Sequence, residues 1–109
     1  MGRYEMFKDN ITRFRFRLRA GNYEIILVSE SYNFKSSCLD GIASVQKNCT
    51  NDSNYLRKKA QNGDHYFVLL APNHEAIGTS EMYSSAGAME NGILSVMQNG
   101  ITTNVVDLS

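Results

Sequence analysis

Four arginines alternate with apolar residues along one short segment, and their spacing suits them to binding an anion. Residues 13–20 read RFRFRLRA, so the arginines occupy every second position: Arg13, Arg15, Arg17 and Arg19. In a β-strand, alternate side chains share one face and lie about 6.6 Å apart. That distance is close to the spacing of phosphates along a nucleic-acid strand. The pattern favours an anionic ligand, such as RNA or single-stranded DNA.

A second alternating segment, residues 65–71 (HYFVLLA), carries Tyr66, Val68 and Leu70 where the first carries arginines. A tyrosine can stack on a nucleic-acid base, whereas a large exposed apolar surface usually marks a protein interface. The eleven basic and eleven acidic residues give a net charge of zero, so no overall field attracts polyanions. We therefore favour a protein partner or self-association, and keep nucleic acid or another anion as the alternative.

A Ser-Glu-x-Tyr step occurs twice and offers hydroxyl, carboxylate and phenol groups to an enzyme. The two sets are Ser29, Glu30 and Tyr32, and Ser80, Glu81 and Tyr83. A serine nucleophile needs a neighbouring base, yet no histidine or lysine accompanies the step in both places. We interpret the step as a strand end whose serine bonds the backbone, and keep an enzyme using it as a remote alternative.

The remaining reactive residues form no recognisable metal or cofactor motif. Cys38 and Cys49 stand in the first half of the chain, and His65 and His74 in the second. Zinc sites need about four convergent ligands at characteristic spacings, and no C-x-x-C or glycine-rich phosphate loop occurs. We expect no metal, no cofactor and no catalytic residue.

These candidate residues belong to a unit of about 50 residues that is written twice. A constant shift of 51 positions aligns residues 4–48 with residues 55–99 and pairs Phe16 with Phe67, Gly41 with Gly92, and Tyr32 with Tyr83. A unit of this size buries only about 60% of its unfolded surface and is marginal alone. We expect a single domain, residues 1–109, made of two interlocked repeats (about 4–50 and 55–109) that share one core.

Each repeat begins with a pattern that predicts three strands and then a helix. Strands are expected near residues 4–8, 13–20 and 25–29, and near 55–59, 65–71 and 76–80. We expect Phe16, Ile26, Phe67 and Ile77 to face inward, and Ile25 and Leu27 to lie outside beside the arginines.

The helices are predicted from apolar stripes with i, i+4, i+7 spacing. The stripes are Cys38, Ile42, Val45 and Cys49, and Met89, Ile93, Val96 and Gly100. Asn33 or Ser36, and Ser84 or Ser85, are candidate N-caps. Gly41 and Gly92 lie mid-helix, where glycine is unfavourable, so we expect a close approach to the helix backbone. The polar stretch 50–54 is a linker, and the β-prone tail 101–108 predicts a final strand.

Met1 is followed by Gly2, Arg3, Tyr4 and Glu5 rather than by an apolar run, and no stretch approaches the roughly 20 apolar residues of a membrane span. The two cysteines have no counterparts in the second repeat, which argues against a repeated disulfide framework. We expect a cytoplasmic protein with reduced thiols, no membrane contact and a monomeric state.

Three motifs present in both repeats resemble the YegP-like family of uncharacterised bacterial proteins. They are the F-x-L-x-A-x-N-x-E-x-I strand pair, the S-E-x-Y step and the G-I-x-S-V-x-x-N helix, beginning at Phe16, Ser29 and Gly41 and again at Phe67, Ser80 and Gly92. The resemblance implies an α+β fold: tandem β-β-β-α-β repeats forming one antiparallel sheet, with exchanged C-terminal strands and both helices on one face. It implies no activity, catalytic residue or cofactor.

The sequence thus predicts a small non-enzymatic binding or accessory module that uses the outer sheet face. The residues expected to contact a ligand are Arg13, Arg15, Arg17, Arg19, Tyr66, Val68 and Leu70.

Overall fold

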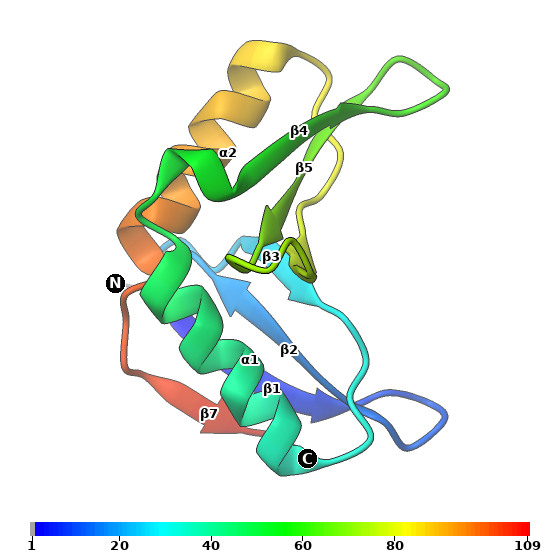
Figure 1. The fold of residues 1–109 in the computed structure, drawn as a ribbon, viewed down its shortest axis with the longest axis vertical. Coiled ribbons are helices and arrows are strands. Elements are labelled where there is room, and N and C mark those ends of the chain that lie inside the picture. The colour runs from blue at the N-terminus through cyan, green and yellow to red at the C-terminus, as the bar shows by residue number, and fades with distance from the viewer. Residues whose placement is uncertain (1) are drawn as a thin grey trace.

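The computed structural model describes residues 2–109 and contains one mixed sheet with two helices (Figure 1). The strands are β1 (Arg3–Lys8), β2 (Phe14–Arg19), β3 (Ile25–Ser29), β4 (Tyr55–Lys59), β5 (His65–Leu70), β6 (Ala76–Thr79) and β7 (Val105–Asp107). The helices are α1 (Lys35–Asn48) and α2 (Ala86–Asn99), with a short 3-10 helix, η1 (Asp52–Asn54), in the predicted linker.

The sheet joins two three-stranded meanders side by side, in the order β4-β5-β6-β3-β2-β1-β7. The meanders meet where β3 pairs antiparallel with β6, with Val28 opposite Thr79. Both helices bury their apolar stripes in a core that is continuous with Phe16 and Phe67. The predicted α+β architecture, with one sheet and both helices on one face, is confirmed.

The final strand departs from the expected pattern in two ways. β7 comes from the second repeat and pairs with β1 of the first, but the pairing is parallel, so the sheet is mixed rather than wholly antiparallel. The exchange is also one-sided: after α1 the chain passes through η1 directly into β4, which leaves no residues for a matching last strand. β4 is therefore an edge strand of the sheet. Its Arg57 is equivalent to the buried Met6 of β1 and forms ion pairs with Asp52 and Glu90.

The two repeats pack their aromatic residues in the same way. In the first, Phe16 stacks on Tyr32 with ring centres 6.4 Å apart at 13°, and meets Tyr4 edge-on at 5.9 Å. In the second, Phe67 and Tyr83 lie 6.4 Å apart at 12°, and Tyr55 meets Phe67 at 5.6 Å. The duplicated residues thus specify one packing arrangement twice.

The mid-helix glycines give these tyrosines room. A Cβ built at Gly41 would lie 2.9 Å from Tyr32 Cζ, and one at Gly92 would lie 2.6 Å from Tyr83 Cζ. Real Cβ atoms do not approach other heavy atoms so closely, so each tyrosine ring packs on the helix backbone itself. The predicted close approach is confirmed, with the tyrosine ring as the contacting group.

Where the repeats meet, large residues of one face small residues of the other. A Cβ at Gly78 would lie 2.8 Å from Leu27 Cγ, although positions 27 and 78 are equivalent in the duplication. Likewise, a Cβ at Gly100 would lie 2.8 Å from Sγ of Cys49, its own equivalent. We call this boundary between the repeats, with its contacts Leu27–Gly78 and Cys49–Gly100, the seam. Each of the two contacts has room for one side chain and not for two.

Two buried tyrosines cross this seam in opposite directions. Tyr4 Oη donates to the carbonyl oxygen of Gly100 at 2.6 Å, and Tyr55 Oη donates to that of Cys49 at 2.6 Å. Burial raises the pKa of both phenols well above the usual range, so they remain hydrogen-bond donors at ordinary pH. Each repeat thereby satisfies a carbonyl at the end of the other repeat's helix.

Two local predictions are wrong. Leu27 is fully buried and lies opposite Leu18, because a β-bulge at the neighbouring pair of β2 and β3 shifts the register and places both Ile26 and Leu27 in the core. Helix α1 starts after Phe34 without a side-chain cap, so neither Asn33 nor Ser36 caps it. Ser85 does cap α2, by accepting a bond from the amide of Ala88.

Within residues 2–109, neither helix has the length and apolar character needed to cross a membrane.

Candidate functional site

The sheet face that points away from the helices, here called the outer face, carries the residues singled out from the sequence. Phe16 and Leu18 point to the core, so the alternate residues of β2 point outward. The register then places one row of outer-face residues across all seven strands. From β7 to β4, that row is Val106, Glu5, Arg17, Val28, Thr79, Val68 and Leu56.

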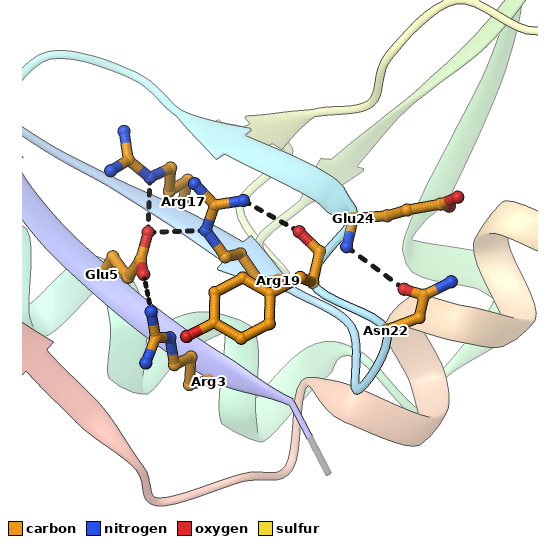
Figure 2. Close-up of polar contacts among 7 residues, drawn as sticks. Arg3, Glu5, Arg17, Arg19, Asn22 and Glu24 are labelled. Atoms are coloured by element: carbon orange, nitrogen blue, oxygen red, sulfur yellow. Dashed lines mark hydrogen bonds and ion pairs between the residues drawn. The ribbon is translucent and has the colours of Figure 1, made fainter.

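Three arginines converge on one carboxylate in the first half of this face (Figure 2). Nε of Arg17 and Nε of Arg19 each lie 2.7 Å from Glu5 Oε1, and Arg3 Nη2 lies 2.5 Å from Glu5 Oε2. The Glu5 side chain is only 3% exposed, whereas those of the three arginines are 23–31% exposed. We call Arg3, Glu5, Arg17 and Arg19 the arginine cluster.

The arginines dominate the ionisation of Glu5. Burial alone would favour the neutral acid, but hydrogen bonds from Arg19, Arg17 and Arg3 outweigh it and lower the Glu5 pKa to about 2. The carboxylate is therefore charged at all but very acidic pH. Three guanidinium charges against one carboxylate charge leave the arginine cluster with two positive charges in excess.

Tyr23 closes one side of the arginine cluster. The guanidinium carbons of Arg3 and Arg19 lie 4.5 Å and 5.5 Å from the centre of its ring, and Arg19 Nη1 donates to its carbonyl oxygen at 2.8 Å. Its φ of 74° is left-handed, and the bond from Glu24 N to Asn22 Oδ1 fixes the adjoining turn (Figure 2). Arg17 lies over Phe7 in the same way, at 4.5 Å.

The predicted row of four evenly spaced arginines is not observed. Arg17 and Arg19 are drawn together because they bond the same oxygen of Glu5. Arg15 instead donates to the carbonyl oxygen of Ser29 at 2.9 Å, and Arg13 lies exposed just before β2 begins. Only Arg17 and Arg19 therefore converge, and the four arginines do not form an evenly spaced row.

The second half of the outer face is apolar at the positions equivalent to the arginine cluster. Leu56, Val68 and Leu70 stand where the first repeat has Glu5, Arg17 and Arg19. Val68 and Leu70 are half-buried and Leu56 is 45% exposed. Tyr66 shares this face, but β6 and β3 separate its strand from the arginines. We call Leu56, Tyr66, Val68 and Leu70 the apolar patch.

The duplicated Ser-Glu-x-Tyr steps are built into the backbone. Ser29 Oγ accepts from Phe16 N at 2.9 Å and donates to the Glu30 carbonyl oxygen at 2.7 Å, and Ser80 repeats both bonds with Phe67 and Glu81. The tyrosines pack against the helix glycines, while both glutamates are exposed. The serine, glutamate and tyrosine of each step therefore point to different places and do not form one reactive group. The prediction that the serine bonds the backbone is confirmed.

A shallow cleft of about 280 Å³ lies between α1 and the β5–β6 turn. Its polar lining includes Tyr32, Ser37, Asp40, Ser44 and Glu75. Ser29 and Glu30 lie outside it, so the Ser-Glu-x-Tyr step does not converge there. Among residues 2–109, no three histidine, cysteine or acidic side chains are grouped so as to hold a metal ion.

Sequence reasoning missed Glu5, Arg3 and Tyr23. A usable signal existed for the first two, because in residues 3–8, RYEMFK, period 2 puts Arg3, Glu5 and Phe7 on one face of the strand next to the arginines. Nothing in the sequence marks Tyr23 as the left-handed residue of its turn.

Comparison with known proteins identifies the family. The model of a domain of unknown function, DUF1508, matches residues 9–55 and again residues 60–107. The chain belongs to the DUF1508 family. Each match begins five residues after the start of a repeat and covers most of it, so each repeat corresponds to one DUF1508 unit.

Relatives and solved structures of this family are similar over the whole chain. A UPF0339 protein of Shewanella oneidensis is 50% identical over 108 residues, covering 99% of this chain and 98% of its own. YegP of Escherichia coli K12 is 47% identical over 106 residues, covering 97% and 96%.

The solution NMR structure of the Shewanella oneidensis UPF0339 protein has a TM-score of 0.93 at 50% identity, covering 98% of this chain and 91% of that one. That of E. coli YegP, described as a protein of unknown function, has a TM-score of 0.94 at 47% identity, covering 98% and 92%. These structures support the DUF1508 fold and assign no activity to it.

Proposed function

We propose that this DUF1508 protein is a non-enzymatic binding module whose partner protein docks on the apolar patch of the outer face. The observation that carries the proposal is the asymmetry of the sheet: one face is covered by both helices, whereas the other leaves Leu56, Val68 and Leu70 partly open to solvent. Exposed apolar side chains that lie together are typical of interaction sites.

The surroundings of the apolar patch support a protein partner. Thr79 and Val28 extend the patch across β6 and β3 toward Arg17, so apolar contacts adjoin a positively charged rim. Interfaces commonly combine an apolar or aromatic centre with a polar, charged edge. The Ser29 and Ser80 hydroxyls are engaged in backbone bonds, which supports a binding role over a catalytic one.

Site-specific photo-crosslinking in living cells tests this role. A photoreactive phenylalanine analogue at Tyr66 is expected to give one discrete crosslinked protein, identified by mass spectrometry. The same analogue at Leu94, which is 54% exposed on α2, is the matched control and should give none. The Tyr66 crosslink should disappear when Val68 and Leu70 are both changed to glutamate. Equal crosslinking from both positions, or none from Tyr66, contradicts the proposal.

Anion binding is the second candidate, and the excess positive charge of the arginine cluster favours it. Titration with a twelve-residue deoxythymidine oligonucleotide distinguishes anion binding from binding of a protein partner. It is followed by NMR through the amide shifts of Arg15, Arg17, Tyr66 and Val68. Binding that moves only the Arg15 and Arg17 amides would involve the arginine-bearing half of the outer face and not the apolar patch.

We also propose that the protein is a cytoplasmic monomer. Cys38 and Cys49 are free thiols, both fully buried, which suits a reducing compartment. Sedimentation velocity at several concentrations is expected to give one species with the mass of a single 12.2 kDa chain.

A further inference from the structure

The arginine cluster retains binding capacity that the fold does not use. Glu5 occupies one nitrogen of each arginine, and Tyr23 accepts one further bond from Arg19. Within residues 2–109, the two Nη groups of Arg17 donate to no protein acceptor. Nitrogen donors and excess positive charge therefore coincide at one place on the outer face.

The second repeat shows that the backbone does not require these charges. At the equivalent positions Leu56, Val68 and Leu70 support the same strands with the same antiparallel pairing. Replacing a buried ion cluster with apolar residues of similar size is often neutral or stabilising, because charges lose hydration on burial. The fold therefore does not require this cluster, and its charge is available for binding.

The geometry favours a compact ligand over an extended one. A polyanion with one charge per phosphodiester needs charges spaced along its backbone, whereas Arg17 and Arg19 bond the same carboxylate oxygen. The two excess charges match a single dianion. Guanidinium groups bind phosphate oxygens through paired, charge-assisted hydrogen bonds, and the exposed Tyr23 ring beside them offers a surface for an organic group.

We propose that Arg3, Arg17 and Arg19, oriented by Glu5, bind the dianionic phosphate of a small phosphomonoester or pyrophosphate compound. In this site Glu5 fixes the guanidinium planes and leaves the Nη groups of Arg17 directed to the ligand. The inference rests on the proposed binding role of the outer face, but it uses the half opposite to the apolar patch.

The test is an NMR titration of the ¹⁵N-labelled full chain with pyrophosphate and with phenyl phosphate at constant ionic strength. Saturable shifts are expected at the Arg17 and Arg19 Nε resonances and at the Tyr23 amide. Arg17→Gln should weaken binding about tenfold or more, since it removes charge-assisted hydrogen bonds. Arg13→Gln, which removes the same charge from an exposed position outside the cluster, should change affinity less than about twofold.

A copy-exchange variant keeps the test independent of any folding defect. Glu5→Leu, Arg17→Val and Arg19→Leu together install the residues that the second repeat already uses, so a dispersed spectrum is expected with phosphate binding abolished. Equal losses in Arg13→Gln and Arg17→Gln, or no saturable shift in the wild type, overturn the proposal. So does tighter binding of the twelve-residue oligonucleotide than of pyrophosphate. The Tyr66 crosslink is unaffected by any of these results, so the two proposals fail separately.

Discussion

The two halves of this protein agree on the helix side of the sheet and disagree on the outer face. The angle between the rings of Phe16 and Tyr32 is 13°, and that between Phe67 and Tyr83 is 12°. The helix glycine against which each tyrosine packs is present in both halves. On the outer face, the positions of Glu5 and Arg17 are taken by Leu56 and Val68. Core packing permits few alternatives, whereas the open face has diverged. Specific binding is therefore to be sought where the repeats differ.

The seam teaches a second lesson about having two copies in one chain. Leu27 faces Gly78, and Cys49 faces Gly100, so equivalent positions are filled by one large and one absent side chain. A symmetric dimer of identical units would present the same residue on both sides. A tandem chain permits the two sides to become complementary, and each repeat is then fitted to the other rather than to itself.

The largest loss of stability is expected when the two halves are separated. We expect residues 1–51, expressed alone, to be unfolded by circular dichroism, because Tyr4 loses its buried partner Gly100 and β1 loses β7. Self-assembly is not expected to rescue the fragment, since a second Leu27 would stand where Gly78 now leaves room. A folded monomeric fragment would show that the repeats are independent.

Making the seam symmetric is the next largest change. Gly78→Leu is expected to destabilise the chain by about 3 kcal/mol, because overpacking forces side chains off their preferred rotamers. Adding Leu27→Gly should recover at least about half of that loss, since it restores one large and one small residue. Urea unfolding of the single and double variants measures both values, and additive losses would rule out complementarity.

The charge difference between the halves predicts a pH dependence. Because the folded pKa of Glu5 is lowered to about 2 from an ordinary 4.5, its contribution is complete above about pH 4.5 and is lost as the pH falls toward 2. We expect a loss of about 3 kcal/mol from this group over that interval. The Glu5→Leu, Arg17→Val, Arg19→Leu variant should lack it, and the difference between the two pH profiles is the measurement.

The crossing tyrosines should behave alike. Tyr4→Phe and Tyr55→Phe each leave a buried carbonyl without its donor, so each is expected to cost about 1 to 2 kcal/mol in the free energy of unfolding. Equal values, measured by urea unfolding, are expected because the two bonds have the same length. Unequal values would reveal that the seam is energetically one-sided.

The smallest effect on stability is expected at β7. This strand pairs with β1 of the first repeat, and β4 of the second repeat has no equivalent neighbour. Lys35 Nζ lies 2.8 Å from Asp107 Oδ2, with both side chains 46% exposed. Lys35→Ala should reduce stability by less than about 0.5 kcal/mol, as is usual for exposed ion pairs. Hydrogen exchange of the Leu108 amide, which bonds Met6, checks whether the strand remains paired.

Period and duplication were sufficient to predict the strands, the helices and the shared core, whereas the single sheet with both helices on one face followed from the family resemblance. The alternation around Phe16 and the stripe through Ile42 place both residues in the core, and a second occurrence of each pattern removes most ambiguity. The four residues before Ser29, IILV, are all apolar, so no alternation shows which of them face the core. The bulge that buries Leu27 therefore cannot be predicted from this segment. The parallel pairing of β7 depends on contacts between distant segments, which no local pattern encodes.

The candidate site was only half accessible from the sequence. The outward direction of Arg17 and Arg19 follows from alternation, but their convergence depends on which strand lies next to β2. Once β1 is placed there, Glu5 is directly opposite Arg17 and the arginine cluster follows. Tyr23 depends on a left-handed backbone that its residue type does not favour.

The thiol of Cys49 gives this protein a built-in reporter of transient opening. It is fully buried where the two helices end, in the space that Gly100 leaves, and burial raises its pKa. A thiol-reactive reagent can reach it only when this contact opens, so the rate of its modification measures how often the ends of the two helices open under native conditions.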